Sequence, residues 1–346
     1  MRAHGGALMA LAAAAAILGC EGRVLTADEA AFFREADPLG FILFARNVET
    51  PEQLRRLTAD LRAAVGRDAP VFVDQEGGRV QRLRAPHWRE WRPPLDEVAR
   101  LSPDARARGL WLRYRLIAAE LRAVGIDGDC APSADLAGPD THPFLRNRCF
   151  GTDPASVAQA ARAAADGLLS GGVLPVLKHL PGHGRAVVDS HLYLPRTTAD
   201  AATLEATDFA PFRALADLPV AMTAHVVFDA FDPDRPATLS PALIGVIRDR
   251  IGFGGLLLTD DLSMEALSGS LGERAAGAIA AGCDVALHCN GRRREMAAVV
   301  AAAGRLLPAA AARAEAALAA RRAPGAIDTD RLAAEFEALA GSVADV

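Results

Sequence analysis

The chain is almost without lysine. Of its 38 basic residues only Lys178 is a lysine, and the others are arginines. A genome rich in arginine codons explains the bias, but not why the single lysine stands where it does. An ammonium is a compact point charge whereas a guanidinium is a planar fork, so the two do not replace each other freely. Lys178 therefore predicts a position whose chemistry needs an ammonium.

The chain also lacks an excess of positive charge. Its formal net charge is -5 at pH 7 and its pI is near 5.9. Nucleic acids and anionic membrane surfaces attract proteins through basic patches. We therefore expect no nucleic acid and no membrane as a partner, and a small neutral or acidic substrate instead.

Closely paired cysteines are missing as well. The five cysteines are odd in number and widely spaced, at Cys20, Cys130, Cys149, Cys283 and Cys289. Metal and redox sites often use a C-x-x-C pair, which this chain does not contain. The pattern favours a reducing compartment, and we expect the protein in the cytoplasm.

The first twenty residues, MRAHGGALMALAAAAAILGC, allow two interpretations. An early arginine, an apolar run and a Leu-Gly-Cys ending resemble a lipoprotein signal, which would make Cys20 a lipid anchor in the envelope. Alternatively, residues 15–19 form the first core strand, and Thr26 and Glu29 form the capping box of the helix that follows. Cleavage before Cys20 would delete that strand, and we favour the strand.

Short apolar runs alternate with amphipathic helical stretches along almost the whole chain. There are eight such runs, beginning near Ala15, Gly40, Pro70, Ile126, Val173, Leu218, Gly255 and Asp284, with helical patterns from Pro51, Gly109 and Asp153 among the stretches between them. Such alternation predicts βαβ units and a parallel sheet. No G-x-G-x-x-G follows the first run, and eight repeats predict a (β/α)8 TIM-type barrel rather than a doubly wound sheet. We expect a single domain over residues 1–346, in which residues 307–346 form helices packed outside the barrel.

Polar residues gather where the predicted strands end. In a (β/α)8 barrel the loops at these carboxyl ends form the active site. Each residue alone could be a solvated loop charge, but their recurrence after six strands predicts a site at one barrel mouth. They are Asp74, Glu76, Asp135, Lys178, His179, His225, Asp260, Asp261 and Asn290.

Two sequence motifs place carboxylate residues at the end of a predicted strand. In VDQEGGRVQRL, Asp74 could accept hydrogen bonds from ligand hydroxyls with Arg82 beside it, or the two could form a purely structural pair. In LLLTDDLSMEAL, one of the adjacent Asp260 and Asp261 suits a carboxylate nucleophile, and the other could cap the next helix.

The third motif, VLKHLPGHGRAVVDSH, collects histidines on a glycine-rich turn. Asp189 stands two residues before His191, so the pair could lie on one side of an extended segment. An aspartate that fixes the tautomer of an imidazole and raises its pKa makes a general acid/base. A metal site of His179, His183, Asp189 and His191 is the alternative, although this spacing matches no zinc motif.

Together these motifs resemble glycoside hydrolase family 3, in its single-domain β-N-acetylglucosaminidase branch. The resemblance runs from about Leu18 to Arg305 and includes GIDGDCAPSADL, NRCFG and MTAHV. It implies that Asp260 is the nucleophile of a retaining reaction, with His191 as general acid/base and Asp189 as its partner. It further implies that the terminal N-acetylglucosamine is held by Asp74, Arg82, Arg148, Lys178 and His179. One departure is Arg185, where the family often has a small polar or acidic residue.

The resemblance also implies a substrate and a setting. Gram-negative members release N-acetylglucosamine from 1,6-anhydromuropeptides during cell-wall recycling in the cytoplasm, and we expect a monomer that needs neither cofactor nor metal. Three alternatives stay open: a phosphorolytic enzyme in which phosphate replaces water, a metal-dependent hydrolase on the same barrel, and a non-catalytic sugar-binding or lipid-anchored protein.

Overall fold

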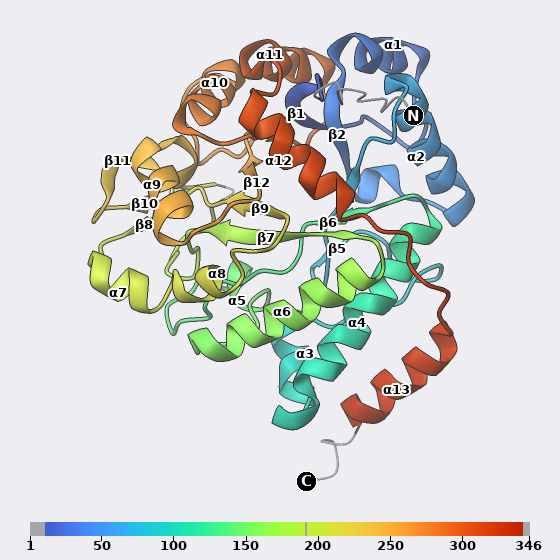
Figure 1. The fold of residues 1–346 in the computed structure, drawn as a ribbon, viewed down its shortest axis with the longest axis vertical. Helices are drawn as coiled ribbons and strands as arrows, with labels where there is room; N and C mark the ends of the chain where they lie inside the picture. Colours follow the sequence, from blue (N-terminus) through green and yellow to red (C-terminus); the bar gives the residue numbers. More distant parts are fainter. Residues whose placement is uncertain (1–10, 191, 342–346) are drawn as a thin grey trace, which may run out of the picture.

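Eight parallel strands close into a barrel, as the sequence predicts. The computed structural model describes residues 11–190 and 192–341. The strands follow one another around the barrel in the order β1, β13, β12, β9, β7, β6, β3, β2. Figure 1 shows the helices that surround them. They are β1 (Ala14–Gly19), β2 (Pro38–Leu43), β3 (Val71–Val73), β6 (Gly128–Asp129), β7 (Leu174–Leu180), β9 (Val220–Thr223), β12 (Leu256–Asp261) and β13 (Val285–His288). Each predicted apolar run supplies one of them.

Helices surround this barrel, and side-chain caps mark where several of them begin. Thr26 and Glu29 form the predicted capping box of α1 (Ala27–Ala36), and α2 (Pro51–Val65) has the predicted bounds. The helix predicted from Gly109 begins earlier, as α4 (Pro103–Ala123), because Ser102 caps a polar first turn that the apolar pattern does not mark. The other outer helices are α6 (Pro154–Ser170), α7 (Ala201–Ala206), α8 (Ala210–Ala214), α9 (Pro241–Gly245), α10 (Leu271–Ala281) and α11 (Arg293–Ala303).

Small elements decorate the loops. A hairpin of β4 (Gln75–Gly77) and β5 (Val80–Gln81) follows β3 directly. A three-stranded sheet joins β8 (Arg196–Thr197), β10 (Val227–Phe228) and β11 (Asp232–Pro236). The remaining short helices are η1 (Ala45–Asn47), α3 (Pro94–Arg100), α5 (Pro143–Arg146), η2 (Ala237–Leu239) and η3 (Val246–Arg250).

The strand interpretation of the amino-terminal run is confirmed. All six residues of β1 are buried, and β1 pairs in parallel with β13 on one side and β2 on the other. Cys20 is 1% exposed, and its carbonyl oxygen accepts hydrogen bonds from Arg46 Nε at 3.1 Å and Asn47 Nδ2 at 3.2 Å. A chain starting at Cys20 would therefore lack a barrel strand. No helix in the described part of the chain is long and apolar enough to span a bilayer.

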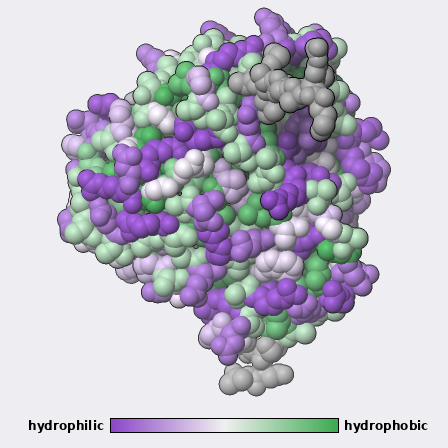
Figure 2. All heavy atoms as spheres, in the orientation of Figure 1, coloured by the Kyte–Doolittle hydropathy of each residue, from purple (hydrophilic) through white to green (hydrophobic). Residues whose placement is uncertain are grey.

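The last two helices contact different parts of the outer surface. In α12 (Pro308–Ala319), Arg313 Nη2 pairs with Asp284 Oδ1 at 2.6 Å just before β13, so α12 lies over the amino-terminal end of the barrel, the end that faces the viewer in Figure 1. Helix α13 (Thr329–Gly341) packs against α3 and α4, and Arg108 of α4 forms a bidentate ion pair with Glu335. Hydrophilic and hydrophobic residues are interspersed over this face in Figure 2.

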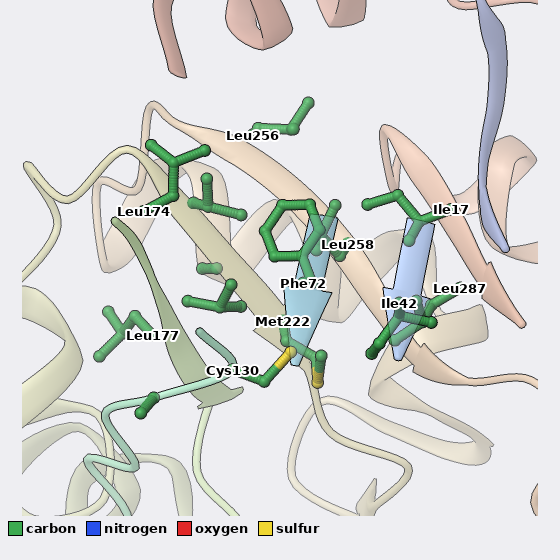
Figure 3. Packing of buried hydrophobic residues seen from close by; sticks show 14 of the residues in the cluster. Ile17, Ile42, Phe72, Cys130, Leu174, Leu177, Met222, Leu256, Leu258 and Leu287 are labelled. Atoms are coloured by element: carbon green, nitrogen blue, oxygen red, sulfur yellow. The ribbon is translucent and has the colours of Figure 1, made fainter. Parts of the chain in front are cut away.

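The barrel interior is filled by side chains, not open. Figure 3 shows Ile17, Ile42, Phe72, Leu258 and Leu287, from five different strands, meeting in one cluster. Each of these side chains is at most 2% exposed. This packed core leaves the loops at the carboxyl ends of the strands as the place for a site.

Candidate active site

The predicted substrate-binding residues line one cavity of about 160 Å³ at the carboxyl ends of the strands. Asp74 follows β3, Lys178 and His179 belong to β7, and Asp260 stands near the end of β12. Apolar side chains complete the wall, among them Phe44, Phe144, Met222, Met264 and Leu287. The structure thus brings together Asp74, Arg82, Arg148, Lys178, His179 and Asp260, residues that lie far apart in the sequence.

Glu76 organises the cations of this cavity. Its carboxylate accepts two parallel hydrogen bonds from Arg148 Nε and Nη2, both 2.9 Å, and lies 2.6 Å from Lys178 Nζ. Burial alone would raise the pKa of Glu76, but the charges of Arg148 and then Lys178 lower it to about 2. A buried carboxylate needs such partners to stay ionised. The sequence marked Glu76 only as a polar strand end. It gave no sign that Glu76 holds Arg148 and Lys178, because nothing in the pattern connects Glu76 to Arg148.

Asp74 pairs with both Arg82 and Lys178. Arg82 Nη2 donates to Asp74 Oδ2 at 2.8 Å, and Lys178 Nζ lies 3.3 Å from Oδ1. Burial would raise the pKa of Asp74, but the charges of Lys178 and Arg82 hold it well below its usual range. Gly77 and Gly78 take positive φ values of 108° and 58°, and this turn returns the chain so that Arg82 reaches Asp74.

His179 is oriented by Asp135, which the sequence marked only as a polar residue at a strand end. His179 Nδ1 lies 2.7 Å from Asp135 Oδ2, which leaves Nε2 directed toward Arg148 at 3.4 Å. Asp135 is 1% exposed, and burial would raise its pKa, yet the charge and hydrogen bond of His179 lower it to about 2. An ionised carboxylate on Nδ1 fixes the tautomer that presents Nε2 to a ligand.

Asp260 and Asp261 differ in their surroundings. The pKa of Asp260 is lowered: burial alone would raise it, but His179 and His225 outweigh that effect. Asp261 instead accepts from Ser263 Oγ at 2.6 Å and from the Cys289 backbone N–H at 3.2 Å. The expectation that one of the pair caps the next helix is wrong, because Ser270 caps α10 and Asp261 holds the turn after β12.

The loop after β7 carries the predicted acid/base pair. Asp189 is half-buried there, and the next residue, Ser190, lines the cavity. His191 lies outside the described residues. Arg185, the departure from the family pattern, points to a neighbouring loop, where its Nε donates to Asp208 Oδ2 at 2.8 Å. Arg185 therefore does not line the cavity.

A further buried acid, Asp129, lies close enough to Lys178, Asp74 and Glu76 for their charges to act on it. Asp129, at the end of β6, is fully buried; its Oδ1 accepts from the Gln75 backbone N–H at 2.9 Å, while Oδ2 has no partner among the described residues. Burial raises the pKa of Asp129 to about 8, so this carboxyl is mostly protonated at neutral pH. It contributes little negative charge to a region that already holds Asp74 and Glu76.

Two residues of the predicted metal alternative, His179 and His183, form a group with Asp135. Ligand atoms of Asp135, His179 and His183 lie within 4.8 Å of one another, and both ring nitrogens of His183 lack a partner among the described residues. Burial, with the neighbouring charge of His179, lowers the pKa of His183 to about 3, so its ring is neutral and could ligate. However, a cation there would compete for the hydrogen bond between Asp135 and His179.

The chain matches the glycosyl hydrolase family 3 N-terminal domain over residues 25–319. It belongs to glycosyl hydrolase family 3. A β-hexosaminidase of Alkalilimnicola ehrlichii is 41% identical to it over 284 residues, which are 79% of this chain and 80% of the relative. NagZ from Neisseria gonorrhoeae superposes with a TM-score of 0.82 at 31% identity, covering 96% of this chain and 97% of NagZ.

The same NagZ has been solved with ligands. One structure contains N-trifluoroacetyl-D-glucosamine (TM-score 0.82, 31% identity, 96% and 98% coverage), and another contains a zinc ion (TM-score 0.81, 29% identity, 96% and 97% coverage). This family 3 chain is therefore a glycoside hydrolase related to the β-hexosaminidases, and its substrate is a carbohydrate.

Proposed function

We propose that this family 3 enzyme is a retaining exo-β-N-acetylglucosaminidase. The observation that carries the proposal is Asp260: its carboxylate is held ionised in the wall of a cavity whose base is closed by the barrel core. A carboxylate in that state can attack the anomeric carbon of a sugar and form a covalent glycosyl ester. Water then releases the sugar, with net retention of configuration.

Five side chains are proposed to hold the sugar before attack. Asp74 offers carboxylate oxygens to hydroxyl groups, and His179 offers Nε2. Arg82, Arg148 and Lys178 can donate hydrogen bonds while their carboxylate partners fix their positions. Preformed ion pairs reduce the reorganisation needed when the sugar binds.

We assign the general acid/base role to the loop after β7. His191 would protonate the leaving oxygen and afterwards accept a proton from water, and Asp189 would orient it and stabilise its charged form. Histidine here replaces the second carboxylate of most glycosidases. The proposal for His191 rests on the sequence motif, since the residue lies outside the described part of the chain.

The proposed natural substrate is an N-acetylglucosaminyl 1,6-anhydromuropeptide, with the enzyme acting as a cytoplasmic monomer in cell-wall recycling. The relationship to NagZ and the β-hexosaminidases supports this choice. We also propose that residues 1–346 form one domain, with residues 307–346 as its helical extension; the packing of α13 on α3 and α4 supports this.

Hydrolysis of two chromogenic glycosides tests the function. We expect 4-nitrophenyl β-N-acetylglucosaminide to be cleaved and the corresponding β-glucoside to be a poor substrate. NMR should detect the β-anomer of the released sugar first. Release of the α-anomer first would contradict retention. Adding phosphate separates the phosphorolytic alternative, because that reaction would yield a sugar 1-phosphate instead of the free sugar.

A further inference from the structure

The cavity mouth carries a cation that the sugar-binding set does not include. Arg79 stands at the tip of the hairpin between β4 and β5, is exposed to solvent, and lines the cavity. The three other cationic side chains in the lining each have a carboxylate within 3.5 Å: Arg82 has Asp74, and Arg148 and Lys178 share Glu76. Arg79 forms no ion pair within 4.0 Å with a carboxylate of residues 11–190 and 192–341.

Arg79 is nevertheless held in place. Its Nη2 donates to the backbone oxygen of Phe144 at 2.7 Å, and its guanidinium carbon lies 4.5 Å from the centroid of the Phe144 ring. Stacking on an aromatic face fixes the plane of the fork, while the other nitrogens keep free donor hydrogens. Because the Arg79 side chain is already held in place, it loses less conformational entropy when a ligand binds.

The charges around Arg79 indicate what this fork would bind. The guanidinium carbon of Arg148 lies 5.3 Å from the centroid of the same Phe144 ring. Burial and the charges of Arg148 and Arg82 lower the pKa of Arg79, while the charges of Asp189 and Glu76 raise it. In the inner cavity Arg82, Arg148 and Lys178 are paired with Asp74 and Glu76, whereas Arg79 at the mouth has no ion pair within the described part of the chain. A planar guanidinium in such a setting matches the two oxygens of a carboxylate.

We propose that Arg79 recognises a carboxylate on the leaving group of the substrate, beyond the sugar that fills the cavity. The inference rests on the proposed glycosidase function and adds a residue that selects among β-N-acetylglucosaminides by the charge of the aglycone. Arg79 touches the departing part of the substrate and takes no part in the bond-breaking step. Its effect should therefore appear mainly in KM.

A matched pair of substrates tests this role. The N-acetylglucosaminides of 3-hydroxybenzoate and 3-hydroxybenzamide are nearly isosteric and differ in charge. A charge-assisted bidentate contact at a partly exposed site favours the benzoate by about 10-fold in kcat/KM. We expect Arg79→Gln to abolish this preference and Arg79→Lys to restore only part of it, because an ammonium cannot present the same fork.

Arg250→Gln is the control. Arg250 is an exposed arginine of η3 that pairs with Glu205 outside the cavity, so this variant should keep the full preference for the benzoate. Equal kcat/KM for both compounds with the wild type would overturn the role of Arg79 while leaving the glycosidase intact. A fall in kcat for both compounds with Arg79→Gln would also overturn the proposal. It would indicate instead that Arg79 acts by positioning Asp189, whose charge acts on Arg79. If the wild type cleaves neither compound, the proposed function fails and the role of Arg79 fails with it.

Discussion

Glu76 and Arg148 face each other through two parallel N–H···O bonds of 2.9 Å, and Glu76 is only 1% exposed. The same carboxylate holds Lys178, so one buried anion positions two of the cations that line the cavity. Removing that anion would leave both cations in a partly desolvated site. The sugar-binding wall and the stability of the fold therefore depend on the same residue.

Glu76→Gln should lower both stability and affinity. Breaking a buried pair by removing one partner costs about 3–5 kcal/mol of the free energy of unfolding, and the loosened Arg148 and Lys178 should raise KM. Urea denaturation and steady-state kinetics measure the two effects. Glu49→Gln is the matched control, because Glu49 and Arg23 form an exposed pair with side-chain exposures of 53% and 51%, and its loss should cost less than about 1 kcal/mol. Equal stabilities for both variants would contradict the argument.

Asp260→Ala should nearly abolish turnover. Loss of a catalytic nucleophile lowers kcat by roughly 10⁴- to 10⁶-fold. Added azide should restore cleavage of the 4-nitrophenyl substrate and yield an α-glycosyl azide, because a small anion can attack from the emptied face. Asp261→Asn keeps an oxygen for Ser263 and should retain far more activity. If Asp261→Asn is the inactive variant and azide rescues it, the nucleophile has been assigned to the wrong member of the pair.

Asp129 should make a contribution to stability that falls with rising pH. The pKa of this carboxyl is raised from its ordinary value of 3.8 to about 8 in the folded protein. Between these values the folded state binds a proton that the unfolded state has lost, so the contribution of Asp129 to the free energy of unfolding decreases by up to about 1.4 kcal/mol for each pH unit. Asp129→Asn should remove that slope and make the variant more stable than the wild type at pH 8. Parallel stability curves between pH 5 and 8 would show that Asp129 is ionised throughout.

Zinc should inhibit the enzyme rather than support it. A chelator is expected to leave kcat/KM unchanged, since the proposed chemistry uses carboxylate and imidazole groups alone. Added Zn²⁺ could be ligated by Asp135, His179 and His183 and would then displace the hydrogen bond that orients His179. The variant His183→Gln should weaken this inhibition. Loss of activity in chelator, restored by zinc, would instead favour the metal-dependent hydrolase.

The sequence allowed the strands to be located but not the ion pairs of the site. Apolar runs bounded by polar or turn residues mark all eight strands, and the strand ends marked Asp74, Lys178 and Asp260 as neighbours. The partner of Glu76 is Arg148, 72 residues along the chain in an irregular segment after α5, so no local period connects them. Nor does the pattern distinguish Asp129, which is fully buried and has a raised pKa, from the other strand-end acids. Pairing of this kind depends on which strands become neighbours when the barrel closes.

The single lysine has a practical consequence for chemical labelling. All other cationic side chains of the described surface are guanidinium or imidazole groups, and Lys178 is 2% exposed and bound to Glu76 and Asp74. A reagent selective for primary amines can therefore acylate only one side chain, and it reaches that side chain only when these ion pairs open. The rate at which Lys178 is acylated would thus report the opening of the candidate site directly, without any engineered probe.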